Sequence, residues 1–199
     1  MALLPRNFQQ LQSRQTLVYV SVEGAKRERL YFEAVSALVS VDTERSVRLE
    51  IDSPPSGESS PEAVLNRAKA FRRLHSYTDP YRAWLVMDMD RQHVPQFETL
   101  RSEIDSLGFE LGLSNPCFEL WLWLHENDAD VALTDAKSLK SVLAFDMNEW
   151  NKDPKADRIR EAVRRAEALP GSATEPFPAN PGTQLGALFR HLGFGTVTV

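Results

Sequence analysis

The stretch TLVYVSVEGAKRERLYFEAVSALVS, residues 16–40, decides the fold class. Residues 16–22 are rich in β-branched and aromatic side chains, which is typical of a strand buried on both faces in a parallel sheet. Glu23 and Gly24 form a turn, and the apolar residues that follow recur at helical spacing. The stretch therefore predicts a strand, a turn and a helix in succession.

The same pattern recurs along the next hundred residues. Further apolar runs predict strands at 47–51, 81–88 and 109–114. The periodic segments between and after them predict helices that begin at Pro61, near Pro95 and at Pro116, where Asn115 is the expected cap. Strands that alternate with helices favour an α/β fold with a parallel sheet flanked by helices.

The region after residue 126 differs, because helical patterns replace the strands. Helices are expected at 135–144, 154–169 and 183–192, the last after a stretch rich in proline and glycine. We therefore predict an α/β core over residues 14–126 and a mainly helical C-terminal extension over 127–199. The extension is expected to pack on the core within one structural domain.

Composition limits the classes of function. The chain has 199 residues, 23 basic and 28 acidic side chains and a formal net charge of −5, so general attraction to nucleic acid is not expected. Its single cysteine, Cys117, excludes an intrachain disulfide and a thiolate metal cluster. The N-terminal residues lack the pattern of a signal peptide, and no apolar run is long enough for a membrane span. We expect a cytoplasmic protein without membrane contact.

Three acidic residues follow two of the predicted strands. Glu23 ends the first strand, and Asp88 and Asp90 end the strand at 81–88. Because parallel strands present their carboxyl ends at one edge of the sheet, these carboxylates are expected to converge there. Such a site suits Mg²⁺ or Mn²⁺ and the hydrolysis of a phosphodiester. The alternative is that the two aspartates are solvated turn residues that cap the next helix.

Other polar residues near this edge are secondary candidates. Glu119 lies in an apolar segment, so it must be paired, protonated or bound to a ligand, and a catalytic role competes with a structural one. Residues that could contact a substrate phosphate, with a solvated surface or a helix cap as the alternative, are Lys26, Arg27, Arg91, His93, Ser114 and Asn115.

Three segments carry a resemblance to a known family. VYVSVEGAKRERLYFEA, AWLVMDMDRQH and GLSNPCFELWLWLHE resemble successive motifs of the RloB-like family, which belongs to the wider Toprim superfamily. A late element with Asn180, Pro181 and Thr183 resembles the family's Asn-Pro-x-Thr motif. The first motif departs from the family at Arg27, where relatives usually carry threonine.

The resemblance implies a Toprim-like fold and a metal-dependent nuclease acting in bacterial antiphage defence, in restriction or abortive infection. In that scheme Glu23 is a general acid/base or metal ligand, and Asp88 and Asp90 bind the metal. We expect nucleic acid as substrate, DNA or RNA with tRNA among the candidates, and we allow for an ATPase partner protein and a homodimer. The competing hypothesis is a non-catalytic interaction or regulatory subunit of an ATPase-containing complex.

Overall fold

The computed structural model describes residues 16–42, 47–55, 58–74, 81–89, 94–169 and 176–195. These residues form a mixed α/β fold around one five-stranded sheet. Four strands run parallel in the order β2-β1-β3-β4, and the short strand β5 pairs antiparallel with β4 at the edge. The strands are β1 (Thr16–Val22), β2 (Val47–Asp52), β3 (Tyr81–Asp88), β4 (Glu110–Asn115) and β5 (Gly182–Thr183).

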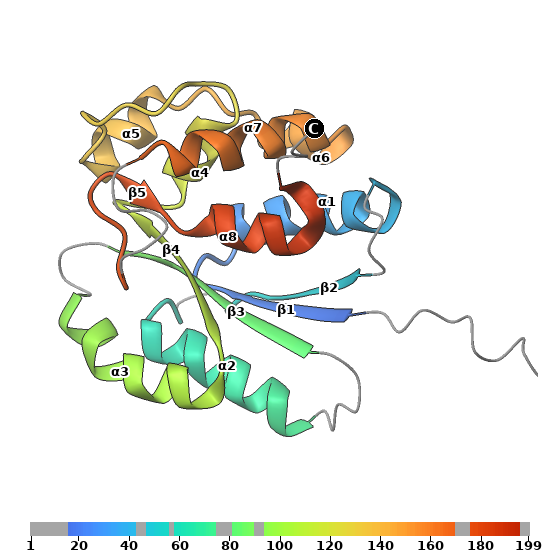
Figure 1. Cartoon of the computed structure of the whole chain (residues 1–199), viewed down its shortest axis with the longest axis vertical. Helices are drawn as coiled ribbons and strands as arrows, with labels where there is room; N and C mark the ends of the chain where they lie inside the picture. The colour runs from blue at the N-terminus through green and yellow to red at the C-terminus, as the bar shows by residue number, and fades with distance from the viewer. Residues whose placement is uncertain are drawn as a thin grey trace, which may run out of the picture.

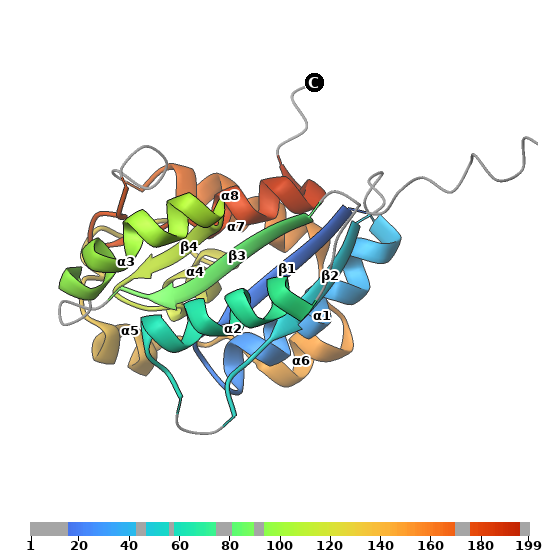
Figure 2. The same cartoon turned by 90° about the horizontal axis from the view of Figure 1, so that it is seen from below.

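Helices cover both faces of the sheet (Figure 1), which explains why its inner strands are apolar at nearly every position. Helices α2 (Pro61–Leu74) and α3 (Val94–Leu107) lie on one face, and Figure 2 shows them from below. The opposite face carries α1 (Arg27–Asp42), α4 (Glu119–Leu124), α5 (Ala136–Val142), α6 (Met147–Lys152), α7 (Ala156–Glu167), α8 (Leu185–Phe189) and the π-helical turn η2 (Arg190–Phe194).

Strand alternation divides the core in two. In β3, Trp84 and Val86 face the layer of α1 and α4, whereas Leu85 and Met87 face α2 and α3. Asp88 has the same parity as Trp84 and Val86, so it lies on the side of α1 and α4.

The C-terminal region is tied to the sheet as well as to its helical layer. Strand β5 places Thr183 opposite Ser114 of β4, and the two buried hydroxyls lie 2.8 Å apart. The Asn180 side chain also donates a hydrogen bond to the carbonyl of Thr134. Because β5 pairs with β4, the sheet includes residues from both sides of position 126, the predicted boundary between core and extension.

The structure confirms the four parallel strands but corrects some element boundaries. Asn115 does not cap α4, because it still belongs to β4 and its side chain donates to the carbonyl of Pro178. Helix α4 begins at Glu119, three residues after Pro116. Thr183 lies in a strand rather than in the last helix, and α6 was not predicted. Among the described residues, no helix is long and apolar enough to cross a membrane.

Candidate functional site

Glu23 and Asp88 meet at the carboxyl edge of the sheet. The backbone N–H of Glu23 donates to the carbonyl of Val86 over 2.9 Å, which continues the pairing of β1 with β3 beyond the strand end. In return, the backbone N–H of Asp88 donates to Oε2 of Glu23, also over 2.9 Å. The Glu23 carboxylate is therefore held against the last residue of β3.

The side chain of Asp88 is oriented by the beginning of α4. Its Oδ1 accepts a hydrogen bond of 2.7 Å from the backbone N–H of Phe118, the residue that precedes the helix. No side chain of the α4 segment itself caps this helix. A carboxylate from the neighbouring strand therefore meets one of the N–H groups that a helix start leaves without an intrahelical partner.

Negative charge is concentrated around Asp88. Burial raises the pKa of Asp88 well above its usual range, and the carboxylates of Glu23, Glu28 and Glu119 act in the same direction. The hydrogen bond from Phe118 opposes them by favouring the ionised form. A bound cation would relieve this repulsion, because it would stabilise the ionised form of each carboxylate.

Glu28 is a member of this cluster that sequence reasoning missed. Its carboxyl group folds back over Gly24, so that a Cβ at that position would lie only 1.8 Å from Oε2. Burial raises the pKa of Glu28, and the carboxylate of Glu119 contributes in the same direction. The signal in the sequence was a glutamate one helical turn after the glycine, where only a residue without Cβ leaves it room.

Glu119 is a buried carboxylate with two cationic partners. Its side chain is 9% exposed and forms ion pairs with Arg27 of α1, which donates a direct hydrogen bond, and with Lys140 of α5 at 3.6 Å. Sequence reasoning therefore identified correctly that this carboxylate needs a partner.

The remaining site residues predicted from the sequence do not all lie beside Glu23 and Asp88. Lys26 is exposed, whereas Ser114 is 1% exposed and directs its hydroxyl to Thr183 inside the sheet. Cys117 is buried beneath the site, and burial together with Glu119 and Asp88 raises the pKa of its thiol. Three candidates lie outside the described residues: Asp90, Arg91 and His93.

The carboxylates around Asp88 fit a hard divalent cation, because such ions prefer oxygen ligands. The positive charge of the ion would also offset the repulsion between the carboxylates. Within the described ranges, however, no three acidic, histidine or cysteine side chains already form a metal-binding group. The residues available to hold an ion are Glu23 and Asp88, with Glu28 at their side.

A basic residue supports the strand that carries Glu23. Arg67 of α2 donates a hydrogen bond of 2.5 Å to the carbonyl of Val22 and pairs with Asp52 at the end of β2. Its side chain is only 14% exposed, although α2 carries several other basic residues. Arg67 fixes the ends of β1 and β2 next to the acidic site.

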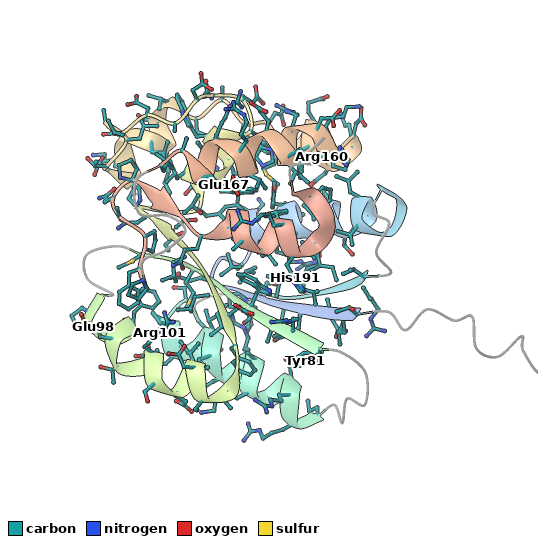
Figure 3. The ribbon with its side chains drawn as sticks, viewed as in Figure 1. Tyr81, Glu98, Arg101, Arg160, Glu167 and His191 are labelled. Atoms are coloured by element: carbon teal, nitrogen blue, oxygen red, sulfur yellow. The ribbon has the colours of Figure 1, made fainter. Side chains whose placement is uncertain are left out.

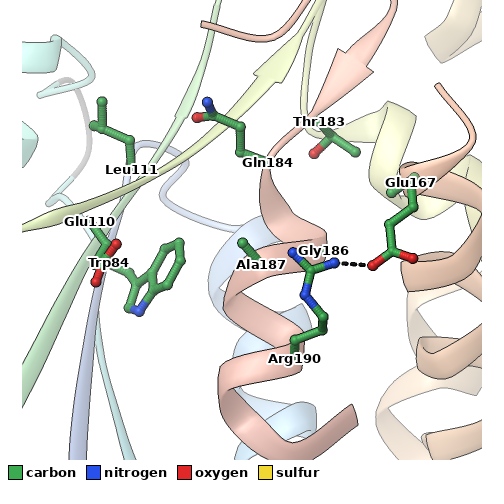
Figure 4. Close-up of a pocket in the computed structure, with 10 residues that line it drawn as sticks. Trp84, Glu110, Leu111, Glu167, Thr183, Gln184, Gly186, Ala187 and Arg190 are labelled. Atoms are coloured by element: carbon green, nitrogen blue, oxygen red, sulfur yellow. Dashed lines mark hydrogen bonds and ion pairs between the residues drawn. The ribbon is translucent and has the colours of Figure 1, made fainter. Parts of the chain in front are cut away.

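Two hollows on the molecule lie away from the acidic residues. The cavity in Figure 4 has a volume of about 130 Å³ and is lined by Trp84, Leu111 and the ion pair of Arg190 with Glu167. A wider hollow of about 420 Å³ includes Arg101. Figure 3 shows Arg101 on α3 and Glu167 on α7, on opposite faces of the sheet. Neither hollow is lined by Glu23, Asp88 or Glu119.

Comparison with known proteins identifies a family to which the chain is similar. Searches of curated proteins and of solved structures found no match. Residues 18–192, which include all five strands except two residues of β1, match the family described as RloB-like protein. The chain therefore belongs to the RloB-like protein family.

Proposed function

We propose that the protein is a Mg²⁺- or Mn²⁺-dependent nuclease with a Toprim-like core, which hydrolyses phosphodiester bonds in DNA or RNA. The observation that carries the proposal is the contact of the Glu23 carboxylate with the backbone of Asp88 at the carboxyl edge of the sheet. Parallel α/β sheets commonly bind their ligands at this edge.

The balance of charge at the edge supports a cation. Among the described residues, the cluster has four carboxylates, from Glu23, Glu28, Asp88 and Glu119. Arg27 and Lys140 form ion pairs with Glu119 and offset the charge of that carboxylate. Glu23 and Asp88 lie at the carboxyl edge itself, where a metal ion would stabilise the ionised form of both.

The residues of the site would have different roles in the hydrolysis. Glu23 and Asp88, together with Asp90, would hold the cation, which supplies Lewis acidity toward the phosphate and its leaving oxygen. The Phe118 N–H keeps the Asp88 carboxylate in one orientation. Glu23 is also able to accept the proton of the attacking water, provided that the substrate is bound beside it.

The family resemblance supports a proposal about the biological role. We propose that the chain is an effector of a bacterial antiphage system and that an ATPase partner controls it. This partner would also account for nucleic-acid delivery, because the net charge of −5 gives the chain no general attraction to a polyanion.

A cleavage assay tests the activity. Purified protein is incubated with tRNA, single-stranded and duplex substrates in Mg²⁺ or Mn²⁺, with Glu23→Gln and Asp88→Asn as site variants. Glu110→Gln is the matched control, because Glu110 pairs with Arg82 at the opposite end of the sheet. Cleavage by wild type and control but not by the site variants is expected. Equal cleavage by all four proteins would refute the proposal.

The second candidate is a non-catalytic regulatory subunit. It is favoured by the formal net charge of −5, which leaves the delivery of nucleic acid to another protein. Phage protection in cells separates the two functions. The subunit hypothesis expects protection to survive Asp88→Asn, whereas the nuclease hypothesis expects it to be lost.

A further inference from the structure

Lys140 of helix α5 lies in the predicted C-terminal extension and forms an ion pair with Glu119. Its Nζ is 3.6 Å from Oε2 of Glu119. Glu119 directly follows Phe118, whose N–H binds the Asp88 carboxylate. The ammonium group also interacts electrostatically with Asp88, one of the residues that we assign to the metal, although it belongs to the C-terminal region.

The need to neutralise Glu119 does not fully explain why Lys140 lies beside it. Arg27 already donates a direct hydrogen bond to Oε1 of Glu119. The 3.6 Å separation of Lys140 from Oε2 is longer than an ordinary N–H···O hydrogen bond. In the described part of the chain, Lys140 forms no other ion pair. Its side chain is 48% exposed, so its three N–H donors can reach a ligand that arrives from solvent.

Glu119 fixes the position of both cations. It lies between α1 and α5 and attracts one basic side chain from each. Partial burial lowers the pKa of Lys140, but attraction by Glu119, Cys117 and Asp88 outweighs this effect and raises it. Lys140 therefore carries its positive charge beside Glu119 and within the electrostatic influence of Asp88.

We propose that Lys140 binds a non-bridging oxygen of the substrate phosphate, so that the C-terminal helical region completes the nuclease site. This inference rests on the proposed function. It assigns to Glu119 a positioning role, because Glu119 would hold Lys140 and Arg27 without contacting the substrate. The ligand class is a nucleic-acid phosphodiester rather than a free carboxylate or a peptide.

Binding of a fluorescein-labelled single-stranded oligonucleotide and of bulk tRNA, measured by anisotropy over a series of salt concentrations, tests the inference. Ca²⁺ replaces Mg²⁺ to limit cleavage. The variants are Lys140→Gln, the charge-conserving Lys140→Arg, and Lys152→Gln as control. Lys152 is exposed and lies on α6, at the far end of the helical layer from α5 (Figure 1).

Lys140→Gln should weaken binding about tenfold or more, and the salt slope should fall by about one unit. Lys140→Arg and Lys152→Gln should bind within about threefold of wild type. Thermal melting of all three should match wild type within a few degrees. Equal binding by Lys140→Gln and Lys152→Gln would overturn the inference and leave the nuclease proposal intact. A wild-type protein that neither binds nor cleaves any of these nucleic acids would overturn both.

Discussion

The backbone N–H of Asp88 donates a hydrogen bond to the Glu23 carboxylate, joining two residues that are 65 positions apart. The contact depends on the parallel pairing of β1 with β3, which brings their carboxyl ends to one edge. It places a carboxylate over the end of a strand whose last side chain is also a carboxylate. Function is the simplest reason to maintain this repulsion.

Asp88→Asn should stabilise the protein in the absence of divalent cations. The change removes a charge that burial and the carboxylates of Glu23 and Glu28 disfavour, yet the amide oxygen can still accept the hydrogen bond from Phe118. We expect the free energy of unfolding at pH 7 to rise by about 1–2 kcal/mol. Urea denaturation measures the change. A variant less stable than wild type would show that the charge of Asp88 stabilises the fold and would contradict the prediction.

Arg27→Met should destabilise the fold, because Glu119 would keep only its longer contact with Lys140. Arg27 is half exposed, so solvent reduces the expected loss to about 1–2 kcal/mol. Arg29→Met is the matched control, since Arg29 forms an exposed pair with Glu33 on the same helix. It should cost no more than about 0.5 kcal/mol. Thermal denaturation measures both variants. Similar melting temperatures would contradict a stabilising role of the ion pair between Arg27 and Glu119.

His125 should make stability depend on pH. Burial, helped by the charges of Arg158 and Arg165, lowers the pKa of His125 to about 3. Between the unfolded value near 6.5 and this folded value, the unfolded chain binds the extra proton, so acidification destabilises the native state.

The matching variant is His125→Phe, which cannot titrate. Relative to this variant, wild type should lose up to about 1.4 kcal/mol of stability for each pH unit below 6.5, down to about pH 3. Denaturation curves at a series of pH values measure the difference. Parallel curves for the two proteins would show that His125 does not titrate in this way.

Gly24→Ala should displace the carboxyl group of Glu28, because the new Cβ would occupy its place. Glu28 has a flexible side chain, so the expected cost in stability is about 1 kcal/mol. In a Glu28→Ala background the same glycine substitution should be nearly neutral. A double-mutant cycle of chemical denaturation tests the coupling. Additive effects would argue against the contact between the two residues.

Much of the fold follows from local sequence signals. The apolar runs of β1 and β3 predict buried parallel strands, and parallel strands imply that Glu23 and Asp88 share an edge. Pro116 misled the prediction, because its preference for the first helical position could not show that Asn115 remains paired with Gly182 in β5. The two-residue strand β5 carries too few residues for any periodic signal.

The rest of the site depends on contacts between distant segments. The cap that Asp88 provides to α4 and the approach of Lys140 to Glu119 arise from tertiary packing and leave no local pattern. Arg67 belongs to a helix with several basic residues, and composition alone does not distinguish the buried one from its exposed neighbours. Glu28 was predictable in principle, from its spacing after Gly24.

Anomalous diffraction from crystals soaked in Mn²⁺ tests whether Glu23 and Asp88 share a cation. We expect a manganese peak within coordination distance of carboxylate oxygens of both residues, and no such peak in Asp88→Asn crystals. Well-ordered wild-type carboxylates without a peak at saturating Mn²⁺, or a peak bound to neither residue, would contradict this expectation.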